Sequence, residues 1–222
     1  GSNALTLGGT ISGTGGLLKT GVSDLTLNGD NSYSGGTILA GGSTVLGHNS
    51  ALGSGSLTVN GAATLDSNQA VTAANQVVLN AGLTVAGSKD LTLDGNISGS
   101  GSLTKNGAST LTLRGVNTYT GGTQVNAGTL ALGAGASLAI NGIVNLASGT
   151  TFDLSAGNGM QTFGTLVGDG AVKMGGNTLA VGGSTDGIFS GSMTGTGSFV
   201  KQGSGTETLT GSNSYTGGTL VA

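Results

Sequence analysis

A unit of 27 residues occurs three times in this chain without a gap, and this recurrence constrains the fold more than any other feature. The copies run from Ile11 to Thr37, from Ile97 to Thr123 and from Met193 to Thr219. They start 86 and then 96 residues apart. Self-similarity on this scale is typical of proteins that stack supersecondary units, each of which buries its apolar side only against its neighbours.

Short runs inside and between the copies alternate between apolar and polar residues. Leu25-Thr26-Leu27 and Leu111-Thr112-Leu113 are examples, and glycine or asparagine follows closely after such runs. This pattern predicts half-buried strands with leucine on one side and threonine on the other. The spacing from Leu5 to Leu25 is 20 residues, and the spacing from Leu91 to Leu111 is the same. We therefore predict coils of about 20 residues, roughly ten or eleven in number, in a rod about 50 Å long.

The composition favours an ordered and extended core. Of the 222 residues, 48 are glycine and only 7% are charged, but 36% are apolar, which is too many for a disordered chain. With four Phe, three Tyr and no Trp, a thin aliphatic core along an axis is expected. Proline is absent, as paired strands require, and cysteine is absent, which excludes disulfides and thiolate sites.

The repeated polar positions define the candidate site residues, which we interpret as structural. The lysine of each copy precedes a turn, and we expect it to be exposed and to guard against edge-to-edge pairing rather than to bind a ligand. The asparagine is expected to stack with its equivalents or to bridge the turn. We expect the tyrosine to pack on a neighbouring coil and the glycine pair to form a sharp corner. These positions are Lys19, Asn31, Tyr33, Gly35 and Gly36; Lys105, Asn117, Tyr119, Gly121 and Gly122; and Lys201, Asn213, Tyr215, Gly217 and Gly218.

Asn-Gly pairs occur at 28–29, 60–61, 106–107 and 141–142. Both residue types tolerate positive φ angles. We therefore expect these pairs to form the turns between strands.

Residues that carry chemistry are few. His48 is the single histidine, and we interpret it as a surface residue in a turn. The nine acidic residues form no column at a spacing of 20, so we expect no catalysis, no metal site and no small-molecule substrate. The glycines at Gly13 and Gly15 resemble part of a nucleotide-binding fingerprint, but the third glycine is replaced by Leu18, so no cofactor is expected. A net charge of −3 without a basic cluster argues against nucleic acid as a partner.

Glu207 breaks the pattern, because Leu25 and Leu111 occupy its position in the other copies. The alternation turns this site inward, where an unpaired carboxylate is costly. Either the third copy is locally twisted, or Glu207 reaches water.

We expect residues 1–222 to form one continuous solenoid. The repeat units are placed at 11–47, 97–133 and 193–222, and less regular coils are placed at 48–90 and 134–192. The residues Gly1-Ser2-Asn3-Ala4 are typical of a cloning remnant, so the chain is expected to be a piece of a longer protein.

The segments Gly101-Ser102-Leu103-Thr104-Lys105-Asn106-Gly107 and Asn117-Thr118-Tyr119-Thr120-Gly121-Gly122-Thr123 resemble the passenger-associated transport repeat of autotransporters. The resemblance covers about half of the chain in three copies. It implies an all-β fold, a right-handed parallel β-helix of the single-stranded, pectin-lyase-like solenoid type. It also implies location at the cell surface of a Gram-negative bacterium, or release, after export through the outer membrane.

The resemblance further implies a role. The chain would be a structural stalk that promotes translocation and folding of the passenger and displays an effector region, and its partner would be its own C-terminal translocator barrel. The alternative is an adhesin or self-association module, in which polar rod faces rich in Thr, Ser and Asn attach to another copy or to a host surface. A polysaccharide-cleaving enzyme is a third class, suggested by analogy of fold alone.

Overall fold

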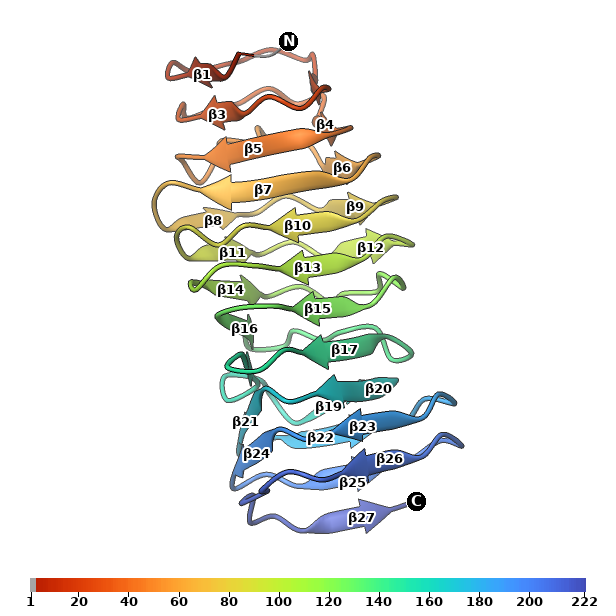
Figure 1. Cartoon of the computed structure of the whole chain (residues 1–222). Coiled ribbons are helices and arrows are strands. Elements are labelled where there is room, and N and C mark those ends of the chain that lie inside the picture. The colour runs from red at the N-terminus through yellow and green to blue at the C-terminus, as the bar shows by residue number, and fades with distance from the viewer. Residues whose placement is uncertain (1–2) are drawn as a thin grey trace.

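The computed structural model describes residues 3–222; Gly1 and Ser2, half of the expected cloning remnant, lie outside the described residues. The chain winds into a right-handed β-solenoid (Figure 1). In this view the coils descend from the N-terminus to the C-terminus, the near strands run from right to left, and the far strands run from left to right. All strand pairs in the described residues are parallel. The predicted fold class is therefore confirmed.

The strands form four sheets. Sheet 1 has 11 strands, one for each coil: β1 (Leu5–Leu7), β3 (Leu25–Leu27), β5 (Gly42–Leu46), β7 (Ala63–Ser67), β10 (Leu83–Val85), β13 (Leu103–Lys105), β15 (Thr123–Val125), β17 (Ile143–Leu146), β20 (Thr165–Gly168), β23 (Gly187–Phe189) and β26 (Glu207–Leu209). Sheet 2 has seven: β8 (Val71–Ala73), β11 (Leu91–Leu93), β14 (Thr110–Leu113), β16 (Thr129–Leu132), β18 (Thr151–Asp153), β21 (Ala171–Gly175) and β24 (Ser192–Gly195).

The third side of the rod is divided between two sheets. Sheet 3 consists of β2 (Leu17–Lys19), β4 (Thr37–Leu39), β6 (Leu57–Val59), β9 (Val77–Leu79) and β12 (Ile97–Gly99). Sheet 4 consists of β19 (Met160–Phe163), β22 (Thr178–Val181), β25 (Phe199–Lys201) and β27 (Thr219–Val221). A regular coil passes through sheets 1, 2 and 3 in turn, as β10, β11 and β12 do before β13 begins the next coil.

The core is a set of stacked aliphatic columns. Leu83 pairs in register with Leu103, and Leu91 with Leu111, and all four side chains are buried. The irregular coils of 134–192 place larger residues inside, where the rings of Phe152 and Phe163 lie 5.9 Å apart. Each coil therefore buries its apolar side chains only between the coils before and after it, as expected of a solenoid.

Each repeat leaves one side of the rod without a strand. Residues 28–36 and 210–218 cross the side of sheet 2, whereas residues 116–121 cross the third side between β12 and β19. The backbone ladder continues through these segments. For example, the Thr118 amide donates to the Ile97 carbonyl at 2.7 Å and the Thr120 amide donates to Gly99 at 3.0 Å. The third side is thus divided at the second repeat, and sheet 2 has no strand at the first and third repeats.

The interpretation of the Asn-Gly pairs as positive-φ turns was wrong at three of the four positions. Only Gly107 of these pairs has a positive φ angle, 69°, and no residue other than glycine has one among the described residues. Gly29 and Gly61 are instead required by close approach, because a Cβ atom there would lie 2.1 Å and 2.4 Å from a carbonyl oxygen of the preceding coil. The asparagines form outer ladders, as between Asn80 and Asn60 at 2.8 Å.

Within the described residues, no helix is long and apolar enough to cross a membrane.

We predict that Gly121→Ala lowers the stability of the solenoid by roughly 2–4 kcal/mol, because overpacking against backbone is not easily relieved. A Cβ atom at this position would lie 2.5 Å from the Gly101 carbonyl carbon in the coil before it. Thermal unfolding followed by circular dichroism measures the effect. Gly8→Ala is the matched control, since a Cβ atom there meets nothing within 4 Å. Equal melting temperatures for the two variants would contradict the role of close approach.

Candidate functional site: the repeat unit and the groove beside it

The three repeats share one local structure but face different sides of the rod. Lys19 ends β2 in sheet 3, Lys105 ends β13 in sheet 1, and Lys201 ends β25 in sheet 4, on the same side as sheet 3. The second copy is therefore turned by one side relative to the others. This follows from the spacing, because 86 residues is not a whole number of 20-residue coils. The unit is thus built from contacts between successive coils and does not depend on a particular side.

The repeat lysine lies inside the rod, so the expectation of an exposed guard residue was wrong. Lys19 and Lys105 are buried, and Lys201 is half-buried. The Lys105 ammonium donates to the carbonyls of Asn106 at 2.6 Å, Gly107 at 2.8 Å and Ala127 at 3.4 Å. Burial lowers the pKa of Lys105, while Asp90 and Asp66 act to raise it.

The lysine therefore joins two coils. Lys19 donates to Gly21 at 2.8 Å in its own turn and to Gly41 at 3.1 Å in the next coil, as Lys105 does with Gly107 and Ala127. A charged donor that satisfies several buried carbonyls stabilises more than a neutral one.

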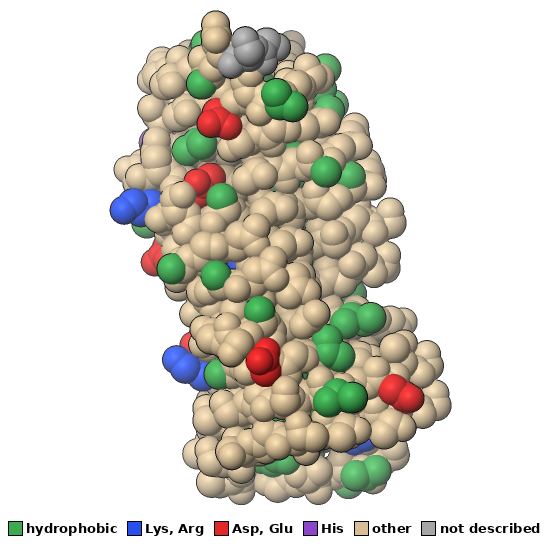
Figure 2. Space-filling view, viewed as in Figure 1, with side chains coloured by type: hydrophobic (Ala, Val, Ile, Leu, Met, Phe, Trp, Pro, Cys, Tyr) green, Lys and Arg blue, Asp and Glu red, His purple; other side chains and the backbone are tan. Residues whose placement is uncertain are grey.

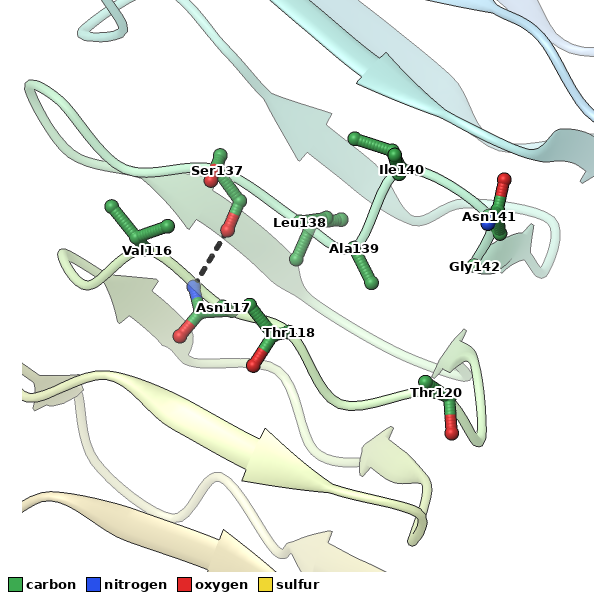
Figure 3. Close-up of a pocket in the computed structure, with 10 residues that line it drawn as sticks. All are labelled: Val116, Asn117, Thr118, Thr120, Ser137, Leu138, Ala139, Ile140, Asn141 and Gly142. Carbon is green, nitrogen blue, oxygen red and sulfur yellow. Dashed lines mark hydrogen bonds between the residues drawn. The ribbon is translucent and has the colours of Figure 1, made fainter.

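The repeat asparagine bridges three coils. The Asn117 Oδ1 atom accepts from the Ile97 amide of the coil before at 3.0 Å, and its Nδ2 atom donates to the Ser137 carbonyl of the coil after at 2.9 Å (Figure 3). Asn31 makes the same pair of contacts with Ile11 and Ala51, both at 2.8 Å. Of the two expected arrangements, stacking or bridging, the side chain bridges, and it does so between coils.

The repeat tyrosine packs inside the rod in the first two copies and is partly exposed in the third. Tyr33 and Tyr119 are 2% exposed. The hydroxyl of each tyrosine contacts the threonine four residues later: Tyr33 with Thr37 at 2.6 Å, Tyr119 with Thr123 at 2.5 Å, and Tyr215 with Thr219 at 2.5 Å. Burial raises the pKa of Tyr119 well above its usual range. The phenol is thus a neutral structural group.

The two glycines of the pair are needed for different reasons. Gly36, Gly122 and Gly218 have φ angles of 80°, 81° and 88°, a left-handed conformation that favours glycine. Gly35, Gly121 and Gly217 instead approach the preceding coil so closely that a Cβ atom would lie 2.5–2.6 Å from its backbone. The pair therefore combines a left-handed residue with a close approach between coils.

The titratable side chains of residues 3–222 are few and lie far apart in the sequence. Charged side chains are few and scattered on the side of sheet 1 (Figure 2). His48 lies in a turn. Its Nδ1 atom is 3.6 Å from the Oδ1 atom of Asp30 and accepts a hydrogen bond from the Ser50 amide at 3.2 Å. The described residues hold no group of three or more His, Cys, Asp or Glu side chains that is arranged to bind a metal ion.

Glu207 points inward and is half-buried, and its strand keeps a regular register with β23, so the third copy is not twisted. Gly187 lies opposite and leaves room for the carboxylate, since a Cβ atom there would meet Oε2 at 2.5 Å. The Oε1 atom is buried without a hydrogen-bond partner. Burial raises the pKa of Glu207 to about 7, and a backbone hydrogen bond from Leu166 and the charge of Lys201 oppose this shift.

A shallow groove lies beside the second repeat. It has a volume of about 460 Å³, and its lining includes Val116, Thr118, Leu138 and Ile140 (Figure 3). Val116 is 55% exposed and Ile140 is 66% exposed. The groove forms where residues 116–120 and 137–142 replace strands between sheets 3 and 4. No charged residue lines it, and its polar side chains are the hydroxyl and amide groups of residues such as Thr118, Thr120 and Asn141.

The comparisons with known proteins agree with the geometry of the repeats. A family model described as passenger-associated-transport-repeat matches residues 17–46, 103–132 and 199–222, the stretches that carry the buried lysine, the bridging asparagine and the paired tyrosine. The chain therefore carries three copies of the passenger-associated transport repeat. It is also 42% identical, over 115 residues, to the adhesin BmaC autotransporter of Brucella suis biovar 1 (strain 1330).

The similar region is 47% of this chain but only 3% of that relative. The comparison with solved structures gave no significant match.

Sequence reasoning missed two features of this chain. It placed Lys19 and Lys105 outside, although both follow the strand alternation inward. The inward register was visible, because Leu103 and Lys105 are two residues apart and therefore lie on the same side of a strand. It also missed the groove, because nothing in the pattern of 134–142 marks the loss of a strand.

We predict that Lys105→Met lowers the stability of the solenoid by roughly 2–4 kcal/mol, because buried carbonyls lose their donor. Chemical denaturation measures the loss. The matched control is Lys89→Met, which removes an exposed lysine and is expected to change stability by less than about 0.5 kcal/mol. An unchanged midpoint for Lys105→Met would show that the ammonium contributes nothing to coil stacking.

We predict that Glu207→Leu stabilises the segment, and more at pH 8 than at pH 5. The folded-state pKa of Glu207, about 7, lies above the ordinary value of 4.5 for this side chain. The folded state therefore binds the proton more tightly, and its stability falls as the pH rises from about 4.5 to above 7. The half-exposed position limits the effect to about 1–2 kcal/mol. Melting temperatures of both proteins across this range test the prediction, and a lower melting temperature for Glu207→Leu at pH 8 would refute it.

Proposed function

We propose that this segment is a structural stalk that promotes translocation of the passenger across the outer membrane and its folding outside the cell. The single observation that carries the proposal is the way each repeat fastens consecutive coils through interior side chains. A coil of this kind docks only on one that is already folded, so folding proceeds along the axis. The stalk would be located at the surface of a Gram-negative bacterium, or released from it.

In this proposal, export proceeds because folding outside the cell disfavours return of the chain through the pore. A chain with no cysteine and few charges threads a narrow pore easily while unfolded. Each coil that docks outside buries several aliphatic side chains, each worth about 1.5–3 kcal/mol. The repeat adds satisfied polar contacts at the point where a strand is missing, so a docked repeat resists unfolding toward the pore. The partner in this step is the passenger's own C-terminal translocator barrel, and the segment itself carries no catalytic role.

Attachment is the second candidate function. The name of the Brucella relative, an adhesin, favours it, although the similar region is a small part of that protein. In this interpretation the polar rod faces, such as the ladder of Thr72, Thr92 and Thr112 on sheet 2, bind a host surface or another cell. Their hydroxyl groups point outward at regular intervals, one for each coil.

An in-register deletion in the full-length protein distinguishes the two functions. Removing residues 103–143 deletes two coils with the second repeat and places Val144 opposite Leu83, since Leu103, Thr123 and Val144 occupy one column. Removing residues 57–96 deletes two coils outside the repeats and places Ile97 opposite Thr37, since Leu57, Val77 and Ile97 occupy one column, and this deletion is the matched control. We predict that the first deletion lowers surface display several-fold, or makes the displayed passenger sensitive to protease, and that the control does not.

Equal display for both deletions would refute the export role of the repeat. If display is equal but attachment to host cells falls in either deletion, the rod face is the functional surface.

A further inference from the structure

The chain contains five Asn-Gly pairs, and one of them has a structural setting unlike that of the other four. In such a pair the glycine amide nitrogen can attack the side-chain carbonyl carbon of the asparagine, because glycine has no Cβ atom to shield it. The attack needs a carboxamide that is free to turn toward its own backbone and a glycine amide that is free to react. The pairs lie at 28–29, 60–61, 106–107, 141–142 and 158–159.

At three of the pairs, a second asparagine in a later coil holds the carboxamide. The Asn60 Oδ1 atom accepts a hydrogen bond from the Asn80 Nδ2 atom at 2.8 Å. The preceding coil restrains the glycine as well, since a Cβ atom at Gly61 would lie 2.4 Å from the Ala40 carbonyl oxygen. These turns are therefore fixed from both sides. The same hydrogen bond joins Asn126 to Asn106 at 2.8 Å and Asn68 to Asn28 at 3.0 Å.

The pair at 158–159 is restrained through its glycine amide instead. The Gly159 amide donates to the Asn177 Oδ1 atom of the next coil at 2.9 Å. Asn177 is 7% exposed, and its Nδ2 atom donates to the Leu154 carbonyl at 2.7 Å. The attacking nitrogen of this pair is thus held by a buried side chain that is itself fixed.

Asn141 has neither restraint. Its side chain is exposed at the rim of the groove and makes no hydrogen bond within residues 3–222 (Figure 3). The Gly142 amide donates inside its own turn, to the Ala139 carbonyl at 2.9 Å. Apart from its chain neighbours, a Cβ atom at Gly142 would meet only Ala139 within 4 Å, so the preceding coil does not press on this glycine. Opening of this one turn therefore frees both reacting groups.

We propose that Asn141 is a site of spontaneous deamidation in the folded protein, and that the asparagine ladders protect the turns at Asn28, Asn60 and Asn106. The Gly142 nitrogen bonds to the Asn141 Cγ atom, the bond from Cγ to Nδ2 breaks, and the glycine amide proton leaves with the side-chain nitrogen as ammonia. Water then adds to one of the two carbonyl carbons of the cyclic succinimide and opens the ring to aspartate or isoaspartate. The reaction does not depend on the export role.

The product changes both the groove and the strand that follows it. The new carboxylate places a negative charge at the rim of a groove that no charged residue lines. Isoaspartate also adds a methylene carbon to the backbone, two residues before β17 begins at Ile143. A turn packed as Gly61 is against Ala40 has no room for this insertion. The ladders therefore preserve the register of the regular coils.

Peptide mapping by mass spectrometry, after incubation of the purified chain at mildly alkaline pH, tests the proposal. Aspartate and isoaspartate are measured at all five asparagines. In the folded chain we expect Asn141 to react about tenfold faster, or more, than each of the other four. In denaturant we expect the five rates to agree within about threefold, since all five asparagines precede glycine and the folded contacts are lost.

Two variants test the protection by the ladders. Asn80→Ala removes the donor from Asn60, and we expect it to raise deamidation at Asn60 about threefold or more while Asn106 is unchanged. Asn126→Ala is the matched variant, and we expect it to raise deamidation at Asn106 and to leave Asn60 unchanged. Circular dichroism melts verify that both variants fold.

Three results would overturn the proposal. Equal rates at Asn141 and at the ladder asparagines in the folded chain would show that the fold does not select the site. Reaction at Asn141 as slow as at Asn158 would show that the single hydrogen bond to Ala139 is enough to protect the turn. An unchanged rate at Asn60 in Asn80→Ala would assign its protection to the packing of Gly61 and not to the ladder.

Discussion

The backbone hydrogen bonds between successive coils are the interaction on which the whole structure depends. Every coil needs its amides and carbonyls paired with the coils on both sides, because unpaired polar groups inside the rod are costly. Regular strands meet this requirement without help, as β10, β11 and β13 do. The repeats meet it where a strand is lost, since Asn117 supplies both an acceptor for the coil before and a donor for the coil after.

The repeat joins neighbouring coils where a strand is missing. The Lys105 ammonium donates to carbonyls in two turns, and Tyr119 fills the interior beneath the missing strand, where its hydroxyl hydrogen-bonds to Thr123. Because these contacts join residues that are close in the chain or one coil apart, the unit can occupy any side of the rod. This explains why the second copy is turned relative to the first and third while its hydrogen bonds are unchanged. A polar core of this kind costs free energy unless it is fully satisfied, and here it is satisfied mainly by backbone carbonyls.

Much of this structure was predictable from the sequence, for identifiable reasons. The equal spacing of Leu5 to Leu25 and of Leu91 to Leu111 predicted the coil length, and the strand alternation predicted the buried leucines. The orientation of Tyr33 followed from its place in the repeat. The burial of Lys105 was not predicted because lysines are usually exposed, although the alternation of its strand placed Lys105 on the same inward side as Leu103. The groove at 116–142 depends on the loss of backbone pairing between distant coils, which no local pattern reports.

Native-state hydrogen exchange of the amides in the strandless segment tests the central claim most directly. If the repeat maintains coil stacking without a strand, the amides of Thr118 and Thr120 exchange as slowly as that of Thr112 in the neighbouring strand β14. Their carbonyl partners, Ile97 and Gly99, lie one coil away at 2.7 Å and 3.0 Å. Exchange of Thr118 and Thr120 at the rate of an exposed loop, while Thr112 stays protected, would show that the repeat is a gap in the solenoid and contradict the account.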